Sequence, residues 1–142
     1  MIIGCDIGGV VKEMISDLPI SNSIESIRQL EEDGNQVIFI SKCGEKFQKI
    51  ILDWLKQNDL KNKIYFCNEY SEKCAICIGL KVNFMIDDKL QVFREIPTTI
   101  KKIWLCDDYK KISGAKKFQP DEVSSVSVCS NWNEIYNLIV NQ

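Results

Sequence analysis

The chain of 142 residues contains no histidine. This absence excludes serine-histidine triads, phosphohistidine chemistry, histidine metal sites and imidazole general bases. Any chemistry must therefore use carboxylates, hydroxyls, thiols, lysines and a bound ion. The chain also lacks an excess of charge of one sign, because 18 Lys and Arg residues face 20 Asp and Glu residues. This balance gives no signal for binding nucleic acid or an anionic membrane.

Long hydrophobic runs are missing as well. No stretch approaches the ~20 apolar residues that cross a bilayer, and the segment Met1–Asp6 reaches a carboxylate too early for a secretory signal. We therefore expect a soluble, cytoplasmic protein without a membrane partner. The seven cysteines are odd in number and lie among apolar runs, which indicates reduced core thiols. Packing is also favoured for Cys74 and Cys77, which lack the further ligands of a zinc site.

Short apolar runs alternate with helical patterns from end to end. This order predicts an α/β fold: a three-layer α/β/α, Rossmann-like domain with a mainly parallel sheet of five or six strands. We expect residues 1–142 to form this single domain. The predicted strands are Ile2–Cys5, Val37–Ile40, Ile64–Cys67, Val82–Ile86, Lys101–Cys106 and Val123–Val128.

Apolar residues at helical spacing predict the helices between these strands. Ser23 is expected to cap one of them, Ser71 to begin another that ends near Gly79, and Ser130 or Asn131 to cap the closing helix. The stripes expected to face the core are Ile24, Ile27 and Leu30; Phe47, Ile50, Ile51, Trp54 and Leu55; and Trp132, Ile135, Tyr136 and Ile139.

Three predicted strands end in a small polar or acidic residue. Asp6 follows the first strand, Ser41 the second, and the pair Asp87 and Asp88 the fourth. Strands often end in turns where such residues are common. In a parallel sheet, however, these ends share one edge, where ligands of open α/β sheets bind. The recurrence therefore predicts a functional site at this edge.

These residues resemble the motifs of the haloacid dehalogenase (HAD) superfamily of phosphohydrolases. The stretch Asp6–Val10 is similar to the first motif, Asp-x-Asp-Gly-Thr/Val, and Val128–Ile135 resembles the closing strand and Trp-x-Glu helix start of many small members. The order and spacing of the motifs extend over essentially the whole chain. The residues that match the second, third and fourth motifs are Ser41, Lys73, and Asp87 with Asp88.

The resemblance implies a phosphatase or phosphotransferase that acts on a phosphorylated substrate through an aspartyl-phosphate on Asp6. Phosphoryl transfer needs an in-line nucleophile and neutralisation of the equatorial oxygens. Lys73 is the second catalytic residue that the resemblance implies, and it also binds the phosphate. The other implied phosphate-binding groups are the backbone amides of Ile7, Gly8 and Gly9 and the hydroxyl of Ser41.

The resemblance also implies Mg²⁺ as the cofactor. Magnesium prefers about six oxygen ligands and keeps several waters, so a few protein oxygens suffice. The implied ligands are the carboxylates of Asp6 and Asp87 and the carbonyl of Gly8. Asp88 is a further ligand or a partner of one.

The first motif departs from the family at Gly8, where the family carries the aspartate that protonates the leaving group and later activates water. Such a group contributes ~10²–10⁴-fold to the rate. Its absence favours slow hydrolysis of esters with good leaving groups, a long-lived phosphoenzyme, or a phosphate-binding pseudoenzyme. Residues 11–22 and 44–71 are too few for a cap domain. We expect an open site that takes a large substrate or is closed by a homo-oligomer.

Three alternatives remain open at this point. The stretch Ile3–Gly9 also resembles the first phosphate loop of the sugar kinase and actin-like ATPase fold, although that fold needs roughly twice this length. The second alternative is a HAD-fold module that binds phosphate or a protein without catalysis. Thirdly, Lys46 or Lys81 could replace Lys73 as the lysine of the third motif.

Overall fold

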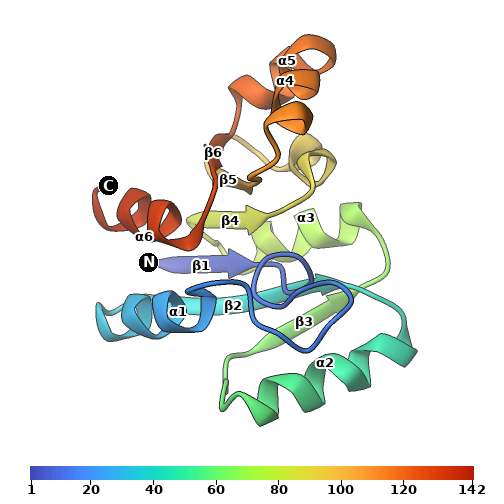
Figure 1. The fold of residues 1–142 in the computed structure, drawn as a ribbon, viewed down its shortest axis with the longest axis vertical. Helices are drawn as coiled ribbons and strands as arrows, with labels where there is room; N and C mark the ends of the chain where they lie inside the picture. Colours follow the sequence, from blue (N-terminus) through green and yellow to red (C-terminus); the bar gives the residue numbers. More distant parts are fainter.

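The computed structural model describes all residues, 1–142, and contains one sheet of six strands. All neighbouring strands are parallel, and their order across the sheet is β3-β2-β1-β4-β5-β6. The predicted parallel sheet is confirmed, and β1 lies at its centre (Figure 1). The strands are β1 (Ile2–Cys5), β2 (Gln36–Lys42), β3 (Ile64–Cys67), β4 (Phe84–Asp87), β5 (Lys101–Leu105) and β6 (Ser127–Cys129).

Helices cover both faces of the sheet, which confirms the three layers. One core cluster joins one face to the first, second and last helices, and a second cluster joins the other face to the remaining helices. None of the helices has the length and apolar character needed to cross a membrane. The helices are α1 (Ser23–Glu32), α2 (Glu45–Gln57), α3 (Tyr70–Gly79), the 3-10 helix η1 (Leu90–Glu95), α4 (Tyr109–Phe118), α5 (Pro120–Ser124) and α6 (Trp132–Val140).

The central strands are buried on both faces, which explains their continuous apolar runs. In β2, Phe39 joins the cluster beneath α1, α2 and α6, whereas Ile38 and Ile40 join the cluster beneath α3 and η1. Because successive side chains of a strand point to opposite faces of the sheet, one apolar run contributes to both core clusters. All seven cysteines are free, and six of them are buried.

Two expected element boundaries are wrong. Val123 lies in α5 and not in the sixth strand, because Pro120 begins a helix there. Ser23 does not cap α1: the cap position is Asn22, and the buried hydroxyl of Ser23 donates to the carbonyl of Val11 at 2.8 Å. This hydrogen bond ties α1 to the loop that follows β1.

The expected core stripe of α2 is also partly wrong. Trp54 and Leu55 are buried as expected. Phe47 and Ile50, however, are 56% and 46% exposed. These two side chains line a cleft beside the carboxyl ends of the strands, together with the half-buried Ile51.

Candidate active site

Three of the predicted site residues meet where the strand order reverses. The sheet continues from β1 to β2 on one side and to β4 on the other, the arrangement that forms the ligand-binding crevice of such sheets. Cys5 pairs with Ile86, so Asp6 and Asp87 are the next residues on adjacent strands. Ser41 lies near the end of β2 and is buried. The prediction that these strand ends share one edge is confirmed.

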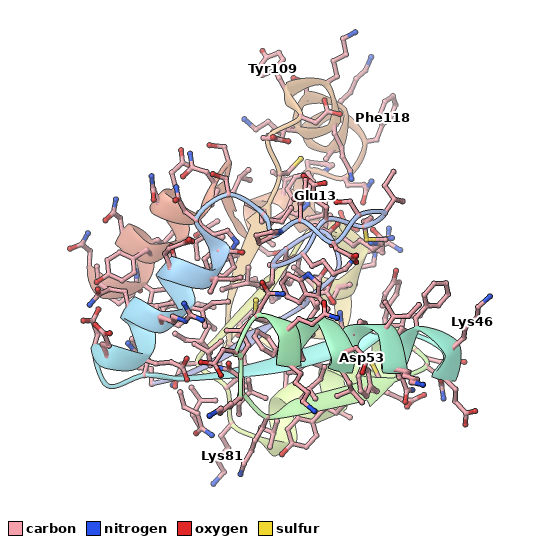
Figure 2. All side chains as sticks on the ribbon, turned by 60° about the horizontal axis from the view of Figure 1, so that its bottom comes forward. Glu13, Lys46, Asp53, Lys81, Tyr109 and Phe118 are labelled. Carbon is pink, nitrogen blue, oxygen red and sulfur yellow. The ribbon has the colours of Figure 1, made fainter.

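Lys73 joins the two carboxylates. Its ammonium Nζ donates to Asp87 Oδ2 at 2.8 Å and to Asp6 Oδ1 at 3.2 Å, and the residue is only 2% exposed. The two alternatives for this lysine are exposed. Figure 2 shows Lys46 at the amino end of α2 and Lys81 after α3, both directed outward. Of the three candidates, Lys73 is the one that contacts the carboxylates.

The site holds more negative charge than its buried lysine neutralises. Burial, and after it the charge of Asp6, raises the pKa of Asp87 to about 8, although Lys73 opposes both effects. Burial likewise raises the pKa of Asp6; Lys73 opposes this shift and Asp88 adds to it. Burial disfavours the charged ammonium of Lys73, yet the two carboxylates outweigh it and raise the pKa of Lys73. A further cation would relieve this imbalance.

The carboxylates fit a divalent cation. Oxygen atoms of Asp6, Asp87 and Asp88 lie within 4.8 Å of one another. Asp88 Oδ1 is buried and has no hydrogen-bond partner, whereas Asp88 Oδ2 lies 3.6 Å from the ammonium of Lys89. An unpaired buried carboxylate oxygen is costly. A hard cation such as Mg²⁺, which takes oxygen ligands, would satisfy it.

The loop after Asp6 is shaped by Gly9. Its φ is +81°, which favours glycine, and a β-carbon there would collide with Asp88 Oδ2. The Gly9 amide already donates to the Lys12 carbonyl at 2.7 Å, and the backbone N–H of Ile7 favours the ionised Asp6 carboxylate and lowers its pKa. Of the three amides expected to bind phosphate, those of Ile7 and Gly8 donate to no backbone carbonyl.

A cleft of about 680 Å³ opens above this loop. Asp6, Ile7, Gly8 and Ser41 line it, whereas Lys73 and Asp87 lie beneath and reach it through Asp6. The connection from β1 to α1 forms its outer side as a short flap, closed by the hydrogen bond from the Glu13 amide to the Leu18 carbonyl at 2.9 Å. Figure 1 shows this connection as a wide coil near the carboxyl end of β1.

All three tryptophans hold loops around the cleft. The indole N–H of Trp54 donates to the carbonyl of Asp17 at 2.8 Å. The indole N–H of Trp104, on β5, donates to the carbonyl of Asp88 at 3.0 Å, and that of Trp132, on α6, donates to the carbonyl of Val10 at 2.7 Å. Sequence reasoning missed these hydrogen bonds, although a buried indole N–H generally needs an acceptor.

We expect Trp132→Phe to lower the free energy of unfolding by about 1–3 kcal/mol, because the buried Val10 carbonyl loses its donor. Urea unfolding followed by circular dichroism measures this change. Tyr109→Phe is the matched control: it also removes an aromatic donor, but Tyr109 is exposed, so the change should stay within about 0.5 kcal/mol. Equal stabilities for the two variants would contradict the anchoring role of Trp132.

The sequence is similar to a curated protein over part of its length. No protein-family profile matches the chain. A proposed nucleotidase of Oceanobacillus iheyensis is 28% identical over 96 residues, which cover 65% of this chain and 51% of that protein. The chain therefore matches about half the length of this curated relative.

Solved structures show the same fold. The D,D-heptose 1,7-bisphosphate phosphatase from B. bronchiseptica, complexed with magnesium and phosphate, has a TM-score of 0.73 at 12% identity, over 99% of this chain and 98% of that chain. A HAD-superfamily hydrolase from Ehrlichia chaffeensis has a TM-score of 0.60 at 13% identity, over 94% and 64%. The HAD-like fold that the motifs predicted is thus confirmed.

Proposed function

We propose that the chain is a Mg²⁺-dependent phosphoric monoester hydrolase or phosphotransferase whose nucleophile is Asp6. The observation that carries this proposal is the buried cluster at the strand-order reversal, where Asp6 and Asp87 pair with one buried lysine and the neighbouring Asp88 has a buried oxygen without a partner. The similarity to a phosphatase bound to magnesium and phosphate supports it.

Asp6 is placed to attack. Its carboxylate lines the cleft and is held by the ammonium of Lys73 and the Ile7 amide, which both favour its ionised form. Attack forms a bond from the carboxylate oxygen to phosphorus while the ester oxygen leaves on the opposite side. The Gly8 amide, the Ser41 hydroxyl and the Lys73 ammonium then stabilise the charge on the phosphoryl oxygens.

The proposed metal ligands are the carboxylates of Asp6 and Asp87 and the carbonyl of Gly8, with Asp88 as a further ligand or as the partner of one. A bound Mg²⁺ supplies positive charge for the phosphoryl oxygens and the entering carboxylate. The hydrogen bond from the Lys89 amide to Asp87 Oδ1, at 3.1 Å, orients the Asp87 carboxylate. The Lys73 ammonium holds its other oxygen.

Gly8 gives a reason to consider a second function, a HAD-fold module that binds phosphate or a protein without turnover. No carboxylate stands at this position, and the Met14 sulfur lies 3.0 Å from where a β-carbon would be. An assay with an aryl phosphate and Mg²⁺, with and without a chelator, separates the two functions. Chelator-sensitive release of phosphate supports the enzyme, and binding of phosphate without release supports the module.

We expect Mg²⁺ to raise the melting temperature of the protein, and more so at pH 8 than at pH 6. The pKa of Asp87 is about 8 without metal, so below that pH the ion must displace a proton. A ligand at 100 times its Kd stabilises a fold by about 2.7 kcal/mol, which corresponds to several degrees at this size. Differential scanning fluorimetry at both pH values measures the rise.

Two acid-to-amide variants locate this metal site. Asp88→Asn should lose most of the Mg²⁺-induced rise, because it removes one of the clustered carboxylates. Asp53→Asn should keep it, since Asp53 is exposed on α2 and lies outside the cluster (Figure 2). An equal rise in both variants would place the ion elsewhere.

A further inference from the structure

Apolar side chains line the cleft on the solvent side of Asp6. Two of them come from the flap after β1, and the others from the amino half of α2. Although they belong to one cavity, several are largely exposed, Ile15 at 99% and Met14 at 61%. Contiguous exposed apolar groups in a soluble fold mark binding sites. We call this set the apolar wall: Met14, Ile15, Phe47, Ile50 and Ile51.

The two sides of the apolar wall are fixed to one another. The indole N–H of Trp54 on α2 donates to the carbonyl of Asp17 on the flap at 2.8 Å. The antiparallel bridge between Lys12 and Pro19 closes the flap at its base. The apolar wall is therefore a preformed surface, as small-molecule sites usually are.

Three of the polar groups beside the apolar wall already have partners. The Ser16 hydroxyl donates to the Glu13 carboxylate at 2.7 Å, and the Lys12 ammonium donates to the Glu13 carbonyl at 2.9 Å. The Lys42 ammonium lies 5.0 Å from the centre of the Tyr70 ring. A sugar or polyol that enters beside these three groups would have to displace their partners to form its own hydrogen bonds, which weakens binding.

We propose that the apolar wall binds the leaving group of the substrate, and that this group is apolar: an aromatic ring or an alkyl chain esterified to the phosphate. The inference rests on the proposed function. In-line attack by Asp6 directs the leaving group away from the nucleophile, toward the open side of the cleft where these side chains lie. The volume of about 680 Å³ suits a small organic group.

Two primary alkyl phosphates test the inference, because their leaving alcohols differ in polarity but little in basicity. With Mg²⁺, the wild-type protein should hydrolyse 2-phenylethyl phosphate at least ~10-fold better than glycerol 3-phosphate, measured as the ratio of the two kcat/KM values. The double variant Ile15→Ser, Phe47→Ser should reduce this ratio toward one. Phe118→Ser is the matched control, since Phe118 is 76% exposed on α4, away from the cleft lining (Figure 2), and should preserve the ratio.

Binding of 2-phenylethylphosphonate, which cannot be hydrolysed, separates this inference from the proposed function. Calorimetry with Mg²⁺ should show tighter binding than methylphosphonate by ~10-fold or more, and the double variant should lose this difference. This result without hydrolysis of either ester, and without hydrolysis of an aryl phosphate, would support the apolar wall and reject the phosphatase. Equal hydrolysis of both esters would overturn the inference and keep the phosphatase. A dimer that dissociates in the double variant, detected by sedimentation, would assign the apolar wall to a second copy and also overturn it.

Discussion

Asp6→Asn is expected to abolish Mg²⁺-dependent phosphatase turnover while the fold remains intact. An amide cannot attack phosphorus, and it is a poorer ligand for Mg²⁺ than a carboxylate. Removal of a nucleophile from a covalent mechanism costs on the order of 10⁶-fold in kcat, so the residual rate should fall below detection. The amide oxygen can still accept the hydrogen bond from Lys73, which preserves the packing around this buried site.

Steady-state release of phosphate from an aryl ester measures this loss, and circular dichroism confirms the fold. Asp53→Asn, the same change at an exposed site on α2, should retain full activity. Substantial metal-dependent turnover by purified Asp6→Asn would mean that another residue is the nucleophile or that a contaminant is assayed.

The sequence predicts this part of the site well because a parallel sheet leaves little freedom there. Once β1 and β4 are adjacent, the register between Cys5 and Ile86 brings Asp6 and Asp87 together. Burial of both strands fixes that register. The resemblance implies the role of Lys73, and its hydrogen bonds to the two carboxylates give the physical reason for a lysine on α3.

The sequence could not predict what covers an apolar face. In α2, the helical spacing correctly identifies one stripe, but Trp54 at one end is buried in the core and Phe47 at the other lines the cleft. Periodicity reports the face of a helix and not its partner. The same limit applies to Ser23, whose hydroxyl bonds to Val11, far along the loop, instead of capping its own helix.

Gly8 is the position where the chain and the family motif disagree, and the backbone there accepts a side chain. Its φ does not lie in the left-handed region, unlike that of Gly9, so a β-carbon adds no backbone strain. The one heavy atom that a β-carbon would meet is the Met14 sulfur at 3.0 Å. That sulfur is at the flexible end of an exposed side chain and can move.

We therefore expect Gly8→Asp to raise kcat/KM for alkyl phosphates by up to ~10²–10⁴-fold, the contribution of a general acid. Aryl phosphates should gain less, because an aryl oxide departs without a proton. This dependence on the leaving group separates an effect on proton transfer from an effect on metal binding, because a change in metal binding would alter kcat/KM for both ester classes alike. Adding Met14→Ala to Gly8→Asp tests whether the Met14 sulfur obstructs the new carboxylate. If it does, kcat/KM of the double variant should exceed that of Gly8→Asp alone. If Gly8→Asp folds and binds Mg²⁺ but its kcat/KM rises for neither ester, the missing acid does not explain slow turnover. The module that binds phosphate or a protein without catalysis then becomes the better explanation of the site.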